Sequence, residues 1–113
     1  MKATELRIGN LIFIPATKQI ATITAISKLG VFVNDNIIGA LPFAEIEPIP
    51  LTEEWLLKLG YTKLSNSSFI DSGHGIWICN GLFMCDKNGI VLKHVHQLQN
   101  LYFALTNQEL TIK

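Results

Sequence analysis

Two cysteines and two histidines in the second half of the chain are the residue types that bind zinc. Five residues separate Cys79 from Cys85, and eight more precede His94 and His96. Thiolate and imidazole are the usual zinc ligands, but this spacing matches no common zinc module. The hairpin register that Asn80-Gly81 predicts also puts the cysteines on opposite faces of a sheet, which excludes a joint site or a disulfide. We therefore expect no metal, no other cofactor, and thiols that behave as small hydrophobic groups.

Two other sets of residues could do chemistry. Residues 71–75 (DSGHG) hold the residue types of a hydrolytic triad, but triad members come from separate segments of a chain. Glu45, Glu47, Glu53 and Glu54 could serve as paired carboxylates or bind a cation. The first set is explained by a glycine-rich turn before a strand, and the second by a solvated surface. We therefore predict that the chain is not an enzyme.

The composition bounds the class of protein. The 113 residues are 49% hydrophobic and only 16% charged, against about 25% charged in an ordinary soluble domain. This length predicts one domain, or two very small lobes that share a core. The low charge fits a compact domain whose surface is coated with Ser, Thr, Asn and Gln, and it equally fits an apolar surface that a second copy or another protein covers. Nine cations balance nine anions and form no cluster, so nucleic acid is not the favoured partner.

The N-terminal residues and the lengths of the apolar runs indicate in which cellular compartment the protein is expected. An acid at Glu5 and the lack of an apolar stretch before it argue against a secretory signal. The longest apolar runs are too short to span a bilayer, so no membrane association is expected. With two cysteines in the whole chain, a reducing cytoplasm is the expected location.

Residues 1–50 are typical of a strand-rich lobe. Short apolar runs at 11–14, 19–27, 31–33 and 37–38 are separated by turn residues, which predicts a small curled sheet or SH3-like barrel. The run 19–27 alternates, so its residues should divide between two faces. Ala21, Ile23 and Ala25 fall on one side, and Ile20, Thr22, Thr24 and Ile26 on the other.

Residues 51–113 begin with the clearest helix start in the sequence. Thr52 is a good N-cap for a helix over 53–59, with two glutamates in its first turn. Leu51 and Leu56 have the spacing of a hydrophobic staple, and Gly60 should end the helix in the left-handed conformation. Trp55, Leu56 and Leu59 are the expected core residues of this helix.

An antiparallel meander should follow, with a register that can be argued from its turns. The dipeptide Asn80-Gly81 predicts a two-residue type I′ hairpin, and Asn88-Gly89 predicts a second turn. Cross-strand partners share a face. One predicted face carries Trp77, Cys79, Leu82, Met84, Val91 and Lys93, and the other carries Ile76, Ile78, Phe83, Cys85, Ile90 and Leu92. We expect the second face to be core and the first to be an interface.

A second helix is predicted over residues 95–106. An apolar stripe of Val95, Leu98, Leu101, Tyr102 and Leu105 should face the core. His96, Gln99 and Phe103 line one flank, whose polar and aromatic character is common at interfaces but also fits an ordinary helix edge. Asn107 can cap the helix, and residues 109–112 are expected to form a closing strand. The predicted fold class is therefore α+β: a strand-rich, barrel-like N-terminal sheet, a short capped helix, an antiparallel meander and a C-terminal amphipathic helix.

Two stretches resemble a family of short uncharacterised proteins found in Bacteroidetes genomes and their bacteriophages. They are IEPIPLTEEWLLKLG at residues 46–60 and HQLQNLYFALT at residues 96–106, and ELRIGN at residues 5–10 is also similar. Where such relatives have Thr-Gly after the second helix, this chain has Thr106-Asn107. The resemblance implies a phage or prophage origin and a host-cytoplasm setting, and it implies no catalytic residues.

The leading hypothesis is a non-enzymatic phage or prophage accessory protein that binds another protein, including further copies of itself. The candidate interface residues are Trp77, Met84, Lys93, His96, Gln99 and Phe103. A nucleic-acid-binding small barrel is the first alternative, and it would use Phe13, Phe32, Lys18 and Lys28. The second alternative is a protein that sequesters small nucleotides as a defence against host signalling.

Overall fold

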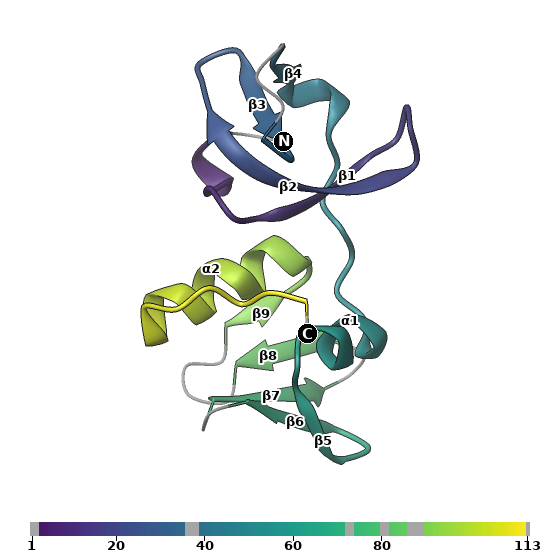
Figure 1. Ribbon diagram of the computed structural model, residues 1–113. Helices are drawn as coiled ribbons and strands as arrows, with labels where there is room; N and C mark the ends of the chain where they lie inside the picture. The colour runs from purple at the N-terminus through teal and green to yellow at the C-terminus, as the bar shows by residue number, and fades with distance from the viewer. Residues whose placement is uncertain (1–2, 36–38, 72–73, 80–81, 86–89, 113) are drawn as a thin grey trace.

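The N-terminal lobe, described over residues 3–35 and 39–45, is a curled half-barrel built from one antiparallel sheet (Figure 1). The computed structural model describes residues 3–35, 39–71, 74–79, 82–85 and 90–112, so the predicted strand at 37–38 lies outside the described residues. The strands run in the order β1 to β4. They are β1 (Leu11–Ile14), β2 (Gln19–Ile26), β3 (Gly30–Val33) and β4 (Leu41–Pro42), flanked by the 3₁₀ turns η1 (Ala3–Glu5) and η2 (Phe43–Glu45).

Strand β1 is covered on both of its faces, which explains why its sequence is continuously apolar. Ile12 and Ile14 belong to the core of the N-terminal lobe. Leu11 belongs instead to the core of the C-terminal lobe, residues 51–113, and Phe13 packs against that second core. The strand is therefore shared between the two lobes.

The alternation predicted for β2 holds only for its first half. Ala21 and Ile23 are buried as expected, but Ala25 is half-exposed, and it is Ile26 that packs against the core. The register with β3 shifts between Ile23 and Ala25, so Thr24 occupies a β-bulge. A bulge adds one residue to one strand and exchanges the two faces beyond it. The predicted placement of Ala25 is wrong for this reason.

A link over residues 46–50 joins the lobes and is fixed at both ends. Phe13 and Glu47 exchange two backbone hydrogen bonds of 2.9 and 2.8 Å, and the Val95 amide donates to Ile49 O at 2.8 Å. Helix α1 (Glu53–Lys58) follows, with Thr52 Oγ1 accepting from the Trp55 amide as the sequence predicts.

The second sheet contains β5 (Thr62–Ser65), β6 (Ser68–Asp71), β7 (His74–Cys79), β8 (Leu82–Cys85) and β9 (Val91–Leu92), paired in chain order and antiparallel. The predicted hairpin register is confirmed, because Cys79 pairs with Leu82 and Trp77 with Met84, although the turn residues themselves lie outside the described part. Asn88-Gly89 also lies outside it. Phe83 pairs with Leu92 and Met84 with Val91, which places Leu92 and Val91 on their predicted faces. Ile90 was expected on the core face but is exposed.

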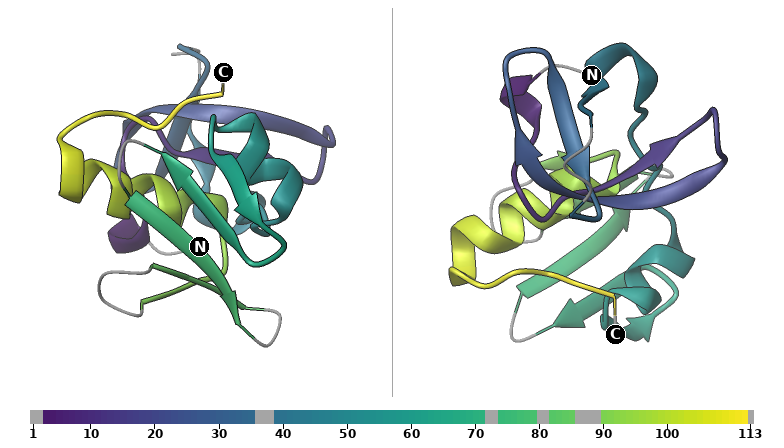
Figure 2. Two further views of the ribbon diagram at one scale, coloured as in Figure 1. Left: turned by 90° about the horizontal axis from the view of Figure 1, so that it is seen from below. Right: turned by 45° about the horizontal axis from the view of Figure 1, so that its top comes forward.

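Helix α2 (Val95–Thr106) lies between the N-terminal lobe and the second sheet, as Figures 1 and 2 both show. Its predicted bounds are confirmed, and Asn107 ends it with a φ of 59°. Leu105 is exposed rather than part of the buried stripe, because it lies in the last turn, at the end of the helix. Residues 109–112 form no strand but run back along α2 as an extended tail that buries Leu110. The two stacked lobes give a particle of 44 × 27 × 23 Å.

Gly30 offers a direct test of the half-barrel. A Cβ added there would overlap the backbone carbonyl of Leu41, whereas at Gly39 it would meet no atom of a described residue within 4 Å. We expect Gly30→Ala to separate β3 from β4 and to lower the free energy of unfolding by about 2 kcal/mol or more, since backbone must move to relieve the overlap. Gly39→Ala, the matched control, should change it by less than about 0.5 kcal/mol. Chemical denaturation measures both, and equal effects would contradict the β3–β4 packing.

Candidate functional site

The outer face of the second sheet exposes a row of large apolar side chains. Trp77 is 50% exposed, Leu82 46% and Val91 37%, while Met84 is half-buried between them. Trp77, Met84 and Val91 are successive cross-strand partners, so their side chains lie side by side on one face. We call this surface the Trp77 face. The opposite face, with Phe69, Ile76 and Cys85, is buried against the helices, as the sequence predicts.

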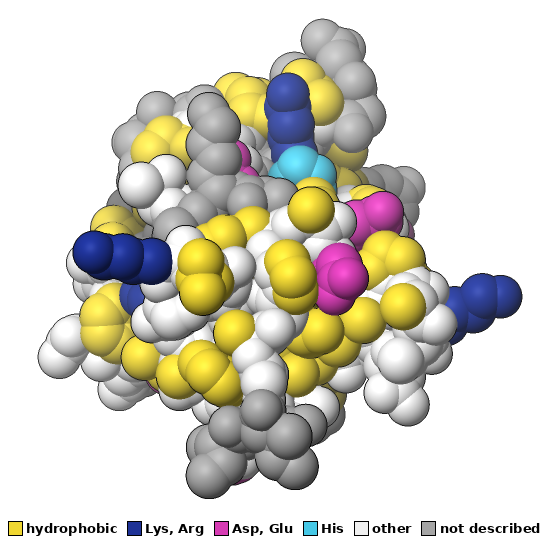
Figure 3. Space-filling model, turned by 90° about the horizontal axis from the view of Figure 1, so that it is seen from above, with side chains coloured by type: hydrophobic (Ala, Val, Ile, Leu, Met, Phe, Trp, Pro, Cys, Tyr) yellow, Lys and Arg dark blue, Asp and Glu magenta, His cyan; other side chains and the backbone are white. Residues whose placement is uncertain are grey.

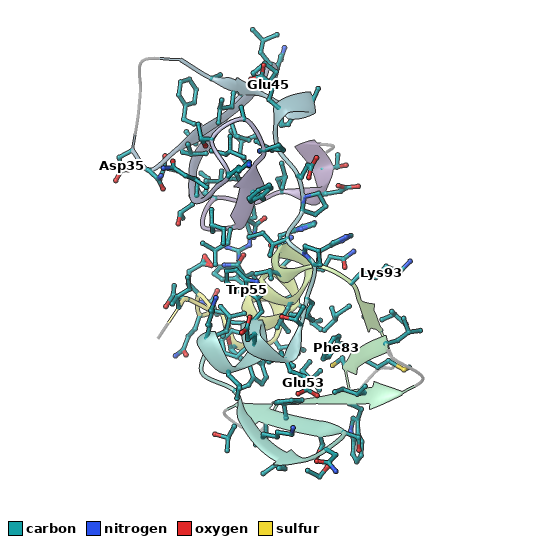
Figure 4. All side chains as sticks on the ribbon, turned by 90° about the vertical axis from the view of Figure 1, so that its right-hand side faces the viewer. Asp35, Glu45, Glu53, Trp55, Phe83 and Lys93 are labelled. Atoms are coloured by element: carbon teal, nitrogen blue, oxygen red, sulfur yellow. The ribbon has the colours of Figure 1, made fainter. Side chains whose placement is uncertain are left out.

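The Trp77 face carries no charge on the described side chains of β6 to β9. The described side chains of β6 to β9 that alternate outward are Ser68, Ile70, Trp77, Leu82, Met84 and Val91. An antiparallel sheet with one solvated face ordinarily alternates apolar and polar residues, with the polar ones outward. Lys93, which follows β9, is exposed and points away from the lobes (Figure 4). Contiguous exposed apolar patches are one of the features from which interaction surfaces of soluble proteins are inferred.

The predicted helix flank lies inside the molecule. His96 is 3% exposed and Gln99 is 1% exposed, because the N-terminal lobe packs on this side of α2. Phe103 is half-buried, with the guanidinium carbon of Arg7 4.3 Å from its ring centroid. His96 and Gln99, which the sequence names as candidate interface residues, are therefore covered within their own chain. They contact the other lobe of their own chain.

Gln99 connects three segments through its side-chain amide. Its Oε1 accepts from the Leu11 amide at 2.8 Å, and its Nε2 donates to Gly9 O and Leu110 O, both at 3.1 Å. A buried amide that finds these partners fixes the start of β1 and the C-terminal tail against α2. We call this contact between the N-terminal lobe and α2 the lobe seam.

Arg7 closes the outer edge of the lobe seam. Its guanidinium makes a bidentate pair with Glu109, at 2.6 and 2.9 Å, and its Nε donates to Asn100 Oδ1 at 3.3 Å. Asn100 Oδ1 also accepts from Asn10 Nδ2 at 2.8 Å. Sequence reasoning missed Arg7, Asn10, Asn100 and Glu109, since residues about ninety positions apart give no local signal of their pairing.

A cleft of about 310 Å³ opens beside the lobe seam at the start of α2. It is lined by Thr4, Glu5, Pro48, His94, His96, Gln97 and Asn100. The rings of His94 and His96 stack with their centroids 5.7 Å apart. Burial lowers the pKa of His96 below its usual 6.5, the nearby His94 lowers it further, and Glu5 raises it. His96 is therefore a neutral imidazole at neutral pH.

The other candidate chemistries do not converge. Among the described residues, no three His, Cys, Asp or Glu side chains lie close enough to hold a metal ion. Cys85 is buried, and the side chain of Cys79 lies outside the described part of the structure. Glu45 lies at the far end of the N-terminal lobe from Glu53 (Figure 4). The run 71–75 falls partly outside the described residues.

The residues of the nucleic-acid alternative lie apart. Lys18 and Lys28 flank opposite ends of the eight-residue β2, a span of roughly 26 Å. Phe13 lies against the link, whereas Phe32 lines a different cavity with Thr24 and Asp35. Figure 3 shows few cationic side chains on the N-terminal end of the molecule, well separated from one another.

Comparison with protein-family models, curated proteins and solved structures finds no match for this chain. Within the part of the chain that the structure describes, neither helix is both long enough and apolar enough to cross a membrane.

Gln99 allows the lobe seam to be tested. Gln99→Leu keeps a similar volume but leaves the Leu11 amide and two carbonyls without their partner. We expect the free energy of unfolding to fall by about 3 kcal/mol, because buried groups lose their hydrogen bonds. Gln108→Leu, at an exposed position between α2 and the tail, is the control and should change stability by less than about 0.5 kcal/mol. Urea denaturation of both variants measures this, and a neutral Gln99→Leu would contradict the role of the amide.

Proposed function

We propose that this protein is a non-enzymatic binding protein whose Trp77 face docks against another protein, in the first place against the same face of a second copy. The observation that carries the proposal is the uncharged row of Trp77, Met84 and Val91 on an outward sheet face. Burying such a row removes apolar area from water, which is the main driving force of association. The separation of the candidate catalytic groups favours binding over catalysis.

A second copy is the partner that this surface fits best. Two sheets can pack face to face about 10 Å apart with their side chains interdigitated. A two-fold dimer brings the same patch together from both copies, so one apolar row covers the other. With nine cations and nine anions the chain has no net charge, so two copies do not repel one another at long range. A strongly charged partner would find no complementary charge on the described strands of this face.

The biological setting of the proposal comes from the sequence resemblance. Residues 46–60 and 96–106 resemble proteins of Bacteroidetes and their phages, which supports an accessory role in the cytoplasm of a bacterial host. Such a role requires a stable contact surface and no chemistry of its own.

Light scattering over a concentration series tests the dimer. We expect the mass to rise toward twice that of the chain, and Trp77→Thr to weaken the association about 30-fold or more, as truncation of an interface tryptophan commonly does. Leu29→Thr is the matched control, because Leu29 is 82% exposed in the β2–β3 turn, away from the Trp77 face. Wild-type protein that stays monomeric up to its solubility limit would contradict the proposal. A control that weakens association as much as Trp77→Thr would also contradict it.

A further inference from the structure

The cleft at the start of α2 lies where both lobes and the link meet. Thr4 and Glu5 come from η1 in the N-terminal lobe, Pro48 from the link, and the remaining lining residues from the start of α2. Any movement of the N-terminal lobe away from α2 would widen this cleft. The width of the cleft therefore shows whether the lobe seam is closed.

His96 is the unusual group in this cleft. It is 97% covered, and its Nδ1 is shielded from solvent without a hydrogen-bond partner in the described part of the structure. His94, the N-cap residue of α2, stacks on it at an interplanar angle of 12°. A buried polar nitrogen without a partner is rare, and it calls for an explanation in terms of what the group does.

We propose that His96 is a proton-sensitive contact that keeps the two lobes closed at neutral pH and loosens the lobe seam in mild acid. A neutral ring fits the closed seam as a flat, largely apolar body. A protonated ring would place a charge in a covered site, next to the positive end of the α2 dipole. Separation of the lobes would let water solvate that charge.

The charged groups around the ring determine the sign of the effect. His94, from the connection before α2, opposes protonation of His96, and Glu5, from η1, favours it. The link contributes the uncharged Pro48 to the cleft, and α2 contributes the uncharged Gln97 and Asn100. Glu5 is exposed, so its attraction is screened by water. Burial and His94 outweigh it, and the pKa of His96 is lowered in the closed state.

The pH range in which the lobe seam weakens follows from the lowered pKa of His96 in the closed form. In an open form the ring regains its usual pKa of 6.5, whereas the closed form binds the proton only at lower pH. Above 6.5 both forms are neutral and the seam is unaffected. As the pH falls below 6.5 the open form gains protons first, so the seam weakens, and the loss levels off below the closed-state pKa. The ratio of open to closed molecules rises about tenfold for each pH unit between the two pKa values.

The test compares the full chain at about pH 7.5 and about pH 5, the range over which histidines titrate. X-ray scattering gives the radius of gyration, and amide exchange gives the protection factor of Leu11, which is bonded to Gln99 across the seam. In wild type we expect a larger radius and lower Leu11 protection at the acid pH, while the Leu56 amide in α1 stays protected. That pattern distinguishes opening of the seam from unfolding.

Four variants determine whether His96 is responsible. His96→Phe keeps a planar ring without a titrating nitrogen, and should abolish the acid response. Glu5→Gln should strengthen the response, because it removes the charge that favours protonation of the closed form, and His94→Asn should weaken it. Glu45→Gln, an exposed carboxylate at the far end of the N-terminal lobe, should leave it unchanged.

Three results would overturn the proposal. They are a wild-type protein that is unchanged between the two pH values, a His96→Phe variant that responds like wild type, and Glu5→Gln and His94→Asn variants that shift the response in the same direction. If His96→Phe does not fold, the opposite shifts of the two neighbouring variants decide the question. The Trp77 face is not involved, so this test is independent of the proposed dimer.

Discussion

The rest of the structure depends on one buried amide. Gln99 of α2 holds the start of β1 and the C-terminal tail through three hydrogen bonds, and it is almost completely covered. A glutamine amide in such a place is stabilising only when its donors and acceptor all find partners, and the same groups would be costly if they were left unpaired. The position of the N-terminal lobe on α2 is therefore specified by hydrogen bonds as well as by apolar packing.

The hydrogen bonds of Gln99 matter to both hydrophobic cores, because they hold strand β1 and β1 contributes residues to each core. Its alternate residues supply the core of the half-barrel on one face and Leu11 to the larger core on the other. If the lobe seam opened, Leu11 and Phe13 would lose their apolar cover, although Ile12 and Ile14 would keep theirs. The bidentate pair of Arg7 with Glu109 lies at the solvent-exposed edge of the same contact. An exposed ion pair of this kind adds modest stability but fixes the geometry of the two chain ends.

The features that could be predicted from the sequence are those that residues close together in the chain determine, such as helix ends and hairpin register. Thr52 and Gly60 bound α1 because caps act within one turn. The register of β7 with β8 is the one that the dipeptide Asn80-Gly81 predicts for a two-residue loop. The bulge at Thr24 could not be predicted, since nothing in an alternating run shows where a strand gains a residue. The burial of His96 and the hydrogen-bond partners of Gln99 were also missed. A polar flank on a helix looks the same from the sequence whether it faces solvent, another protein or a second lobe of its own chain.

Amide hydrogen exchange at neutral pH tests most directly whether the lobe seam joins the two lobes into one cooperative unit. The Leu11 amide is the most informative site, because it is bonded to the Gln99 side chain across the seam. If the account is right, Leu11 exchanges with the same opening free energy as Leu56, whose amide is bonded within α1 in the core of the C-terminal lobe. Rapid exchange at Leu11 with Leu56 still protected would show that the lobes separate freely, and it would contradict the account.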